Sequence, residues 1–264
     1  MSAIYTKEVT THVGRFSLHD ISVSFEVGKI TGIIGPNGSG KSTLLKVLTR
    51  LLSIDKGEVR LNEKKLHEYK AKEFATTLAM LPQSKGVLPN LTVKELITYG
   101  RSPHQQLFTY RLSTDDKIAI EWAMDVTGTS KHANRMFHTL SGGEQQKARI
   151  AMALAQQTNL LLLDEPTTYL DISHQLDVME MLDHINQNYQ MTIIMVLHDL
   201  QQAAKYCHHL ITMKKGAIVT TGQPKEMITA QFLQDVYGIE AKVQFEDGYP
   251  IIIPIKTIKN GRNS

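Results

Sequence analysis

A chain of 264 residues, 42% of them hydrophobic, is long enough to bury a large core and forms one large domain or a domain with a subdomain. Its formal net charge is only +3, and 29 Lys and Arg are interspersed with 26 Asp and Glu, so the composition gives no support to nucleic-acid binding. The N-terminus lacks the apolar segment of a signal peptide, there is no apolar run of about eighteen residues, and the single cysteine, Cys207, excludes an internal disulfide. We therefore expect a protein of a reducing compartment that does not itself span a membrane.

In chain order, the first expected elements are strands within residues 16–35, where short apolar and β-branched runs lead to a glycine-rich stretch. Residues 57–66 predict another strand further along the chain. Residues 41–52 predict a helix between them, because four leucines fall on one helical face: Leu44, Leu45, Leu48 and Leu51. The order of strand, glycine-rich loop and helix is the one that a phosphate-binding loop requires.

Helical patterning begins at about residue 84 and continues to about residue 141. Within this segment, residues 115–128 predict an amphipathic helix with Ser113 or Thr114 as its N-cap. We interpret the segment 84–141 as a helical subdomain inserted into a single domain that spans residues 1–264.

After the insertion we expect a helix from Gly143, a buried strand at residues 159–165, a helix at residues 173–187 and a strand at residues 191–199. Strands that alternate with helices predict an α/β fold whose parallel sheet is covered on both faces. The C-terminal extension, about residues 215–264, predicts a hairpin, a short helix and an irregular end.

Residues 35–42 match the pattern G-x-x-x-x-G-K-[ST] at every fixed position. The glycines allow successive backbone N–H groups to turn toward one anion, and the N-terminus of the next helix adds its positive dipole. Lys41 can reach the β and γ phosphates of a nucleotide, and the Ser42 hydroxyl can bind Mg²⁺. The predicted nucleotide site therefore comprises Gly35, Pro36, Asn37, Gly38, Ser39, Gly40, Lys41, Ser42 and Thr43.

Two carboxylates end the apolar strand at residues 159–165. Asp164 is expected where ligands collect in parallel sheets and would hold Mg²⁺, and Glu165 beside it can orient and deprotonate water. His198 ends the next apolar strand, where a neighbour of the Asp164 strand would present it to the same phosphate. The plainer alternatives are a capped turn for the Asp-Glu pair and a structural role for the histidine. The pair favours ATP hydrolysis over a binary switch.

The stretch LSGGEQ, residues 140–145, is the most discriminating in the chain. Ser141, Gly142 and Gly143 supply a hydroxyl and a helix N-terminus, a second anion-binding feature in a chain that already has one. If two copies pack head to tail, the Ser141 helix of one copy can cap the γ-phosphate held by Lys41 of the other. The stretch therefore predicts a homodimer that forms with ATP.

Together these motifs resemble those of the ATP-binding cassette (ABC) family over essentially the whole chain. The resemblance implies a P-loop NTPase fold of the ABC type, an α/β RecA-like core with a mixed sheet and the helical insertion. The features that carry it are the P-loop at 35–42, Gln83 in MLPQ, LSGGEQ at 140–145, LLLLDEP at 160–166, Leu170-Asp171 and His198.

The resemblance also implies roles for individual residues. Glu165 is the expected general base, while His198 and Lys41 stabilise the γ-phosphate and Gln83 senses Mg²⁺ and the γ-phosphate. Asp171 is expected to lie across the dimer interface. The family usually stacks an aromatic residue on adenine, and the residue that aligns with it here is His12; Tyr5 and Phe16 are the alternative candidates.

Residues 91–105 and 164–182 narrow the resemblance to the ATPase subunits of importers for iron(III)-siderophores, haem and cobalamin, most nearly the ferric hydroxamate type. The resemblance implies a homodimer that closes on two ATP and two Mg²⁺ at the cytoplasmic face of the cell membrane. Its helical insertion would dock onto transmembrane permease subunits, which in turn meet an extracytoplasmic substrate-binding protein. The transported ligand would touch those subunits and no residue of this chain.

Two other classes of function remain to be weighed. A soluble ABC-type ATPase acting on DNA or ribosomes usually has a long coiled coil or two cassettes, whereas this sequence has one P-loop and no sustained heptads. A small-molecule kinase with a P-loop leaves LSGGEQ unexplained. The sequence thus favours the importer ATPase, with haem or cobalamin as alternative cargo.

Overall fold

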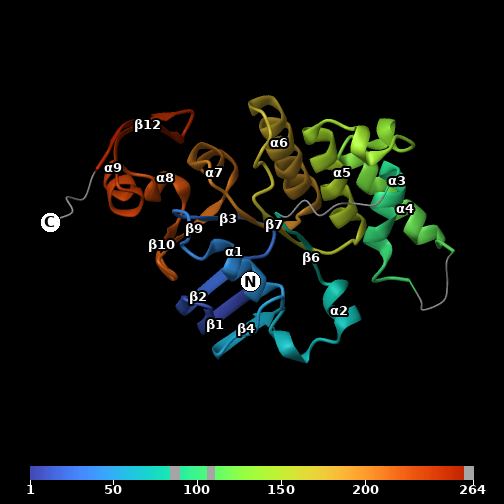
Figure 1. Ribbon diagram of the computed structural model, residues 1–264, viewed down its shortest axis with the longest axis horizontal. Helices are drawn as coiled ribbons and strands as arrows, with labels where there is room; N and C mark the ends of the chain where they lie inside the picture. The colour runs from blue at the N-terminus through green and yellow to red at the C-terminus, as the bar shows by residue number, and fades with distance from the viewer. Residues whose placement is uncertain (84–89, 106–110, 259–264) are drawn as a thin grey trace. The chain divides into compact units, whose positions relative to one another are not determined.

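The computed structural model describes residues 1–83, 90–105 and 111–258 (Figure 1). The chain divides into two compact units, the first made by Met1–Leu66 with Ile194–Ser264 and the second by His67–Ile193. The predicted insertion, residues 84–141, falls within the second unit, and its first six residues lie outside the described part. Within the described residues, no helix combines the length and the apolar character needed to cross a bilayer.

A four-stranded antiparallel sheet begins the first unit, with the strand order β2-β1-β4-β5. Its strands are β1 (Ser2–Val13), β2 (Phe16–Glu26), β4 (Lys56–Leu61) and β5 (Lys64–Lys65). The strand expected at residues 57–66 is present as β4, but it ends at Leu61, because Asn62 and Glu63 adopt positive φ angles of 47° and 65° and turn the chain into a hairpin with β5.

A mixed sheet carries the glycine-rich loop of the first unit. In it β3 (Ile30–Ile34) runs parallel to β9 (His209–Lys214), and β9 pairs antiparallel with β10 (Ala217–Gly222). Beyond the end of β8 (Thr192–Val196), the Leu197 N–H donates to the Ile33 carbonyl at 3.1 Å. The predicted α/β fold with a mixed sheet is therefore confirmed.

Helix α1 (Lys41–Leu48) follows β3 and buries three of the four predicted leucines completely: Leu44, Leu45 and Leu48. The prediction that Leu51 lies on the same helical face was wrong, since its side chain is 67% exposed. Arg50 takes a φ of 60°, which ends the helix, and the Leu51 N–H donates back to the Lys46 carbonyl at 2.9 Å.

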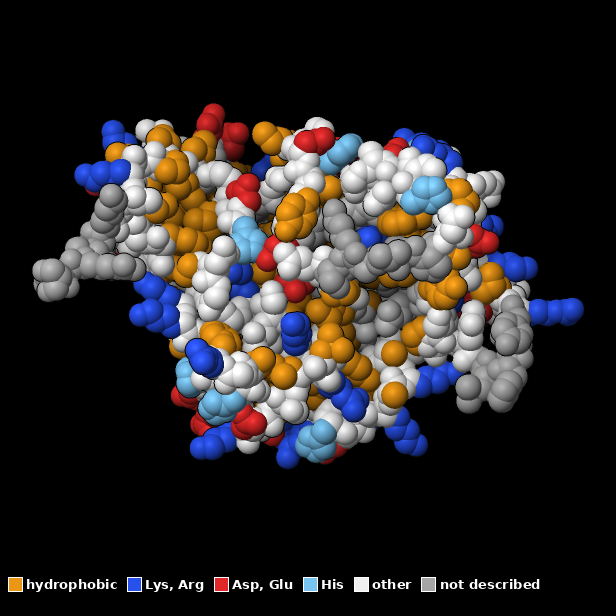
Figure 2. Space-filling view, in the orientation of Figure 1, with side chains coloured by type: hydrophobic (Ala, Val, Ile, Leu, Met, Phe, Trp, Pro, Cys, Tyr) orange, Lys and Arg blue, Asp and Glu red, His pale blue; other side chains and the backbone are white. Residues whose placement is uncertain are grey.

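The C-terminal part of the first unit is more ordered than the sequence predicted. After the helices it forms a hairpin of β11 and β12, not an irregular end, and Asp247 and Gly248 make its turn with positive φ angles of 50° and 82°. Hydrophobic side chains gather over this region (Figure 2). Phe245 of β11 and Ile255 of β12 are exposed. The elements are α7 (Leu200–Tyr206), α8 (Pro224–Met227), α9 (Ala230–Phe232), the π-helical turn η5 (Leu233–Tyr237), β11 (Ile239–Glu246) and β12 (Tyr249–Thr257).

A side chain of α7 bonds to the hairpin at two points. Gln201 donates from Nε2 to the Pro250 carbonyl at 3.2 Å and accepts at Oε1 from the Ile252 N–H at 2.7 Å. Two prolines, Pro250 and Pro254, lie within β12 itself. The first strand positions of β12 are thus bonded to α7 as well as to β11.

The second unit contains parallel strands and most of the helices. The predicted buried strand at residues 159–165 and the N-cap Ser113 are confirmed, since the Ser113 hydroxyl accepts from the Asp116 N–H at 3.0 Å. Its elements are η1 (Leu66–Glu68), α2 (Ala71–Ala75), β6 (Leu78–Leu81), α3 (Val93–Thr98), η2 (Tyr99–Arg101), α4 (Thr114–Val126), η3 (Ser130–His132), η4 (Phe137–Thr139), α5 (Gly142–Ala155), β7 (Leu160–Asp164) and α6 (Ile172–Tyr189).

A buried ion pair joins three of these helical elements. Arg101 Nε lies 2.8 Å from Asp116 Oδ1, both side chains are under 10% exposed, and Arg101 also donates to the Ala155 carbonyl. Burial raises the pKa of Asp116, but hydrogen bonds from Arg101 and Ser113 outweigh it and hold that pKa below its ordinary value. One carboxylate therefore both caps α4 and neutralises the guanidinium that reaches the end of α5.

Removing this guanidinium should destabilise the chain strongly. Arg101→Met is expected to lower the free energy of unfolding by about 3–5 kcal/mol, because the buried Asp116 loses its partner. Lys147→Met removes the partly exposed pair of Lys147 with Asp177 and should cost about 1 kcal/mol or less. Urea unfolding followed by circular dichroism measures both, and equal losses would contradict the role assigned to the buried pair.

Candidate active site

The P-loop of the first unit can be built only with glycine at its bends. Gly35, Gly38 and Gly40 take φ angles of 140°, 74° and 106°, which L side chains rarely adopt. A Cβ at Gly35 would also lie 2.1 Å from the Met213 carbonyl oxygen, and one at Gly40 would lie 2.9 Å from Cζ of Phe16. The glycines of the sequence motif are therefore required by backbone conformation and by close packing together.

Lys41 is folded over this loop. Its side chain is 5% exposed, and its ammonium donates to the Gly35 carbonyl at 2.8 Å and the Pro36 carbonyl at 3.2 Å. Ser39 is also buried, and its hydroxyl has no hydrogen-bond partner among the described residues. The loop thus gathers a cation, a polar hydroxyl and the N-terminus of α1, a set of groups that suits a phosphate.

Two further residues of the first unit lie beside the P-loop. His198 follows Leu197, whose N–H bonds to Ile33 two residues before Gly35, so both segments leave the sheet at the same edge. Tyr237, at the end of η5, lies near the backbone of Gly35; burial raises the pKa of its hydroxyl, and the Gly35 backbone partly opposes that shift. The sequence predicts His198 at this edge but gives no sign of Tyr237, because no local pattern links that residue to a loop about two hundred residues earlier.

In the second unit, the ends of two parallel strands bring Gln83 and Glu165 together. β6 pairs with β7 in the register Leu81 to Leu163, so the residues that follow both strands share one edge. Gln83 donates from Nε2 to Glu165 Oε2 at 2.5 Å. Asp164, the last residue of β7, is 7% exposed. This edge therefore collects a buried carboxylate, a second carboxylate and an amide that orients it.

Thr168 is a site residue that the sequence analysis missed. Its hydroxyl donates to Glu165 Oε2 at 3.0 Å, and its backbone N–H donates to the Glu165 carbonyl at 3.3 Å. Glu165 itself has a φ of 54°, a strained value for a residue with a side chain. The turn that Thr168 closes holds Glu165 in this conformation. In the sequence, the only sign of this turn is that Thr168 follows Glu165 by three residues.

The signature stretch forms the first turn of α5. Ser141 is the N-cap and accepts from the Glu144 N–H at 3.3 Å, while Glu144 Oε2 accepts from the Ser141 N–H at 2.9 Å. That backbone hydrogen bond is the main reason why the pKa of Glu144 is below its ordinary value. A Cβ at Gly143 would lie 2.4 Å from Cγ of His174, so the turn packs against α6 with no room for a side chain.

Asp171 is the N-cap of α6. Its Oδ1 accepts from the His174 N–H and from the Ser173 hydroxyl, each at 2.9 Å. The bond from the His174 backbone, followed by that from Ser173, lowers the pKa of Asp171. The carboxylate is exposed and ionised, and its place across a dimer interface stays a prediction.

The three candidates for the adenine contact differ in their surroundings. Phe16 lies against Gly40 of the P-loop, whereas the exposed His12 contacts Asp55, with 2.7 Å between Nδ1 and Oδ2. Tyr5 pairs across β1 with Arg60 and Ser24. The residue that stacks on adenine also stays a prediction.

Comparison with known proteins agrees with these motifs. The sequence profile described as ABC transporter matches residues 18–168. The chain belongs to the ABC transporter family. As a member of this ABC family it binds nucleotide and is an ATPase, which confirms the resemblance inferred from the P-loop and LSGGEQ.

Curated relatives of this ABC ATPase match it over nearly their whole length. The chain is 44% identical to the petrobactin import ATP-binding protein FpuC of Bacillus anthracis, over 95% of this chain and 92% of that protein. It is 43% identical to the iron(3+)-hydroxamate import ATP-binding protein FhuC of Bacillus subtilis, over 98% and 97%. The ferric enterobactin transport ATP-binding protein FepC of Escherichia coli is 42% identical, over 98% and 96%.

Solved structures share the fold of this ABC ATPase. A putative metal-chelate type ABC transporter in an inward-facing conformation aligns with a TM-score of 0.85 at 24% identity, over 97% of this chain and 98% of that one. A dimeric bacterial ABC transporter cassette aligns with a TM-score of 0.71 at 26% identity, over 84% and 98%. The predicted ABC ATPase fold is thereby confirmed.

The hydrogen bond from Thr168 provides a test of how Glu165 is positioned in this ABC ATPase. Thr168→Val keeps the shape of the side chain but removes the donor, and we expect kcat for ATP hydrolysis to fall roughly tenfold, as for the loss of one hydrogen bond to a charged group. Thr168→Ser should retain most of the activity. Steady-state phosphate release measures both, and a serine variant as slow as the valine variant would contradict the assignment.

Proposed function

We propose that this chain is the ATP-hydrolysing subunit of an ABC importer that takes up iron(III)-siderophore complexes through a partner permease. The observation that carries the proposal is the match of 42–44% identity, over more than nine-tenths of each chain, to relatives named for petrobactin import, iron(3+)-hydroxamate import and ferric enterobactin transport. The match includes the C-terminal extension outside residues 18–168, so it goes beyond what every ABC ATPase shares.

Within this proposal, Mg²⁺ would be held by oxygen ligands from Ser42 and Asp164 with Gln83 nearby. Hydroxyl and carboxylate oxygens are the ligands that Mg²⁺ prefers, and one or two protein ligands with phosphate oxygens suffice for it. When bound, the ion neutralises charge on the phosphates. Lys41 adds a second positive charge at the same phosphates, which stabilises the charge of the transition state.

Glu165 is the proposed general base. Gln83 and Thr168 both donate to its Oε2, so the plane of the carboxylate is held while the group can take a proton from water. His198 would donate a hydrogen bond to the γ-phosphate. Apart from Pro36, which has no N–H group, the remaining residues 35–43 would bind the nucleotide phosphates through their backbone N–H groups.

The second anion-binding feature, Ser141 to Gly143, supports a homodimer as the active form. We propose that this helix end of one copy binds the γ-phosphate of the ATP held by the other copy, with Asp171 at the interface. ATP would then favour the closed dimer because it contacts both copies only in that state. Such coupling is how ATP binding would change the conformation of the permease.

The proposed partners follow from importer function. They are transmembrane permease subunits, which would hold the chain at the cytoplasmic face of the cell membrane, and an extracytoplasmic substrate-binding protein reached only through them. An ATPase acting on DNA or ribosomes fits less well, since these three relatives are named for the import or transport of iron chelates. Haem and cobalamin remain the alternative cargo.

The dimer mechanism predicts the behaviour of a stalled enzyme. Glu165→Gln keeps the shape of the side chain but cannot accept a proton, so ATP should bind and persist, and the chain should dimerise with ATP and return to monomer with ADP. Size-exclusion chromatography with light scattering measures the mass in each nucleotide.

Two second substitutions serve as controls in the Glu165→Gln background. Lys41→Ala should prevent dimerisation because it weakens ATP binding, and Ser141→Arg should prevent it by filling the space where the partner's phosphate binds. A dimer that forms without ATP, or one that is indifferent to Ser141→Arg, would contradict the mechanism.

Permease docking can be tested on the second unit. Lys94 is an exposed residue of α3, so its substitution should not disturb the fold. His104 is less suitable, because it is half-buried and its Nε2 is hydrogen-bonded to the Gln156 carbonyl at 2.8 Å. Lys94→Glu should reduce siderophore-dependent iron uptake several-fold and leave the ATPase rate of the isolated subunit unchanged. Lys117→Glu, on the exposed face of α4, is the matched control. Equal loss of basal ATPase and transport would make Lys94 a structural residue instead.

A further inference from the structure

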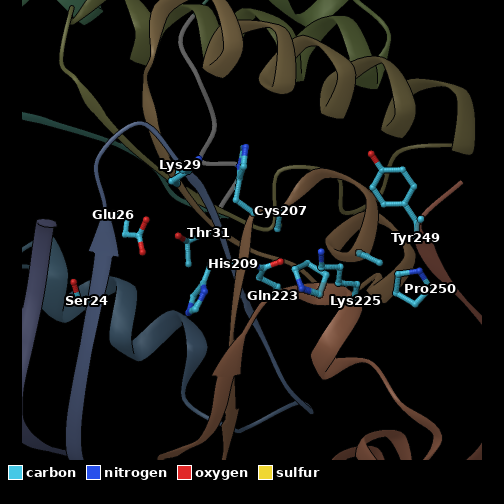
Figure 3. A pocket seen from close by; sticks show the side chains of 14 residues that line it. Ser24, Glu26, Lys29, Thr31, Cys207, His209, Gln223, Lys225, Tyr249 and Pro250 are labelled. Atoms are coloured by element: carbon cyan, nitrogen blue, oxygen red, sulfur yellow. The ribbon is translucent and has the colours of Figure 1, made fainter. Parts of the chain in front are cut away.

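A cavity of about 410 Å³ lies within the first unit and includes no residue of the P-loop (Figure 3). Its walls come from the end of β2, the start of β3, the end of α7, the start of β9, the start of α8 and the start of β12. The volume is within the range of sites that hold small organic ligands.

The cavity has a buried floor and an exposed rim. Thr31, Ala204, Cys207, Pro224 and Pro250 are buried and form most of the floor. The floor is therefore largely apolar and suits the body of a small organic molecule.

One side of the rim is aromatic. The ring of Tyr249 stands at this side and is 43% exposed (Figure 3). A flat ring or a short apolar group could pack against it.

The charge of the rim is mostly positive. Lys29, Lys225, His208 and His209 line the cavity, and Glu26 is the one carboxylate among its lining residues. Lys29 and Lys225 form no ion pair with any residue that the structure describes. His208 accepts at Nδ1 from the Ile30 N–H at 3.1 Å, which places the proton of its neutral ring on Nε2, a donor. These cations and donors around an apolar floor are complementary to an anion with an apolar body.

We propose that this cavity is a regulatory site for a small organic anion, a ring or short apolar body that carries carboxylate or phosphate groups. The anionic groups would bind Lys29 and Lys225 at the rim, and the body would pack on the floor and against Tyr249. The regulatory part of this inference rests on the proposed ATPase function.

Two walls of the cavity are connected along the chain to Gly35 of the P-loop and to His198. Thr31 lies four residues before Gly35 on β3, and Cys207 follows α7, whose N-cap Asp199 is the residue after His198. The third wall, β12, is bonded to α7 by Gln201, and the segment before the hairpin ends in Tyr237, which lies near the Gly35 backbone. A ligand that joins these walls would restrain β3, which runs into Gly35, and α7, which follows His198.

Isothermal titration calorimetry tests the binding. The protein is first saturated with ADP, so that the probe does not enter the nucleotide site, and is then titrated with phthalate, with phenyl phosphate and with the uncharged phthalamide. We expect at least one anion to bind and the amide to bind at least tenfold more weakly. The double variant Lys29→Gln, Lys225→Gln should also weaken the anion at least tenfold, as for the loss of two charge-assisted hydrogen bonds.

The matched control is Lys242→Gln, an exposed lysine of β11 outside the cavity lining, which should bind the anion as the unsubstituted chain does. A stronger response to phthalate assigns the site to carboxylates, and a stronger response to phenyl phosphate assigns it to phosphate esters. Equal binding of anion and amide, or of the double variant and the unsubstituted chain, would overturn the site.

Regulation is tested separately by the ATPase rate. The anion that binds should change the rate of the unsubstituted chain at least twofold and leave the rate of the double variant unchanged. Binding without any change of rate would overturn the regulatory role. Because calorimetry does not depend on hydrolysis, a failure of the site and a failure of the ATPase proposal give different results.

Discussion

The conformation of the loop between β3 and α1 is the constraint on which the rest of the first unit depends. Its three bends use φ angles open to glycine, and at Gly35 the β9 carbonyl of Met213 leaves no space even for a methyl group. The surrounding chain supports this conformation: Gly216 donates to the Ser39 carbonyl at 3.0 Å, and Tyr237 lies near the Gly35 backbone. The loop is therefore held by segments far away in sequence, and its shape does not depend on the eight residues of the motif alone.

In the second unit, capping residues fix the starts of the helices α4, α5 and α6. Ser141, Asp171 and Ser113 each accept hydrogen bonds from the first turn of the helix that they begin. The same side chains that end the loops thus set where α4, α5 and α6 start. Because the proposed γ-phosphate contact uses the start of α5, its position depends on the capping box of Ser141 and Glu144.

Sequence patterns predicted the elements whose signals are local. The P-loop, the buried strand β7 and the N-cap Ser113 all depend on residues within one short window, and the structure has them where the patterns indicated. The failures were of two kinds. Leu51 was placed on a helical face because periodicity does not reveal that Arg50 would leave the helical region, and the hairpin β11–β12 was missed although Asp247-Gly248 is a strong turn signal.

In the candidate site too, residue types with a local motif could be predicted, whereas contacts made by tertiary packing could not. The sequence identified Glu165, Gln83 and Lys41 as chemically suited residues, but it could not reveal that Gln83 and Thr168 bond to the same carboxylate oxygen. It also could not reveal that Tyr237 reaches Gly35, since such contacts follow from tertiary packing and leave no trace in spacing.

The two prolines of β12 have a consequence for the behaviour of the whole chain in a crowded cell. In a strand, alternate N–H groups point to the same side, and the Ile252 N–H points away from β11, because it bonds to Gln201. Pro250 and Pro254 share its side of the strand and have no N–H at all. From residue 250 to residue 254 the outer edge of this ribbon therefore offers no free donor to an incoming strand. A hairpin with exposed Phe245 and Ile255 would otherwise invite strand addition, and this arrangement protects its β12 edge against edge-to-edge aggregation.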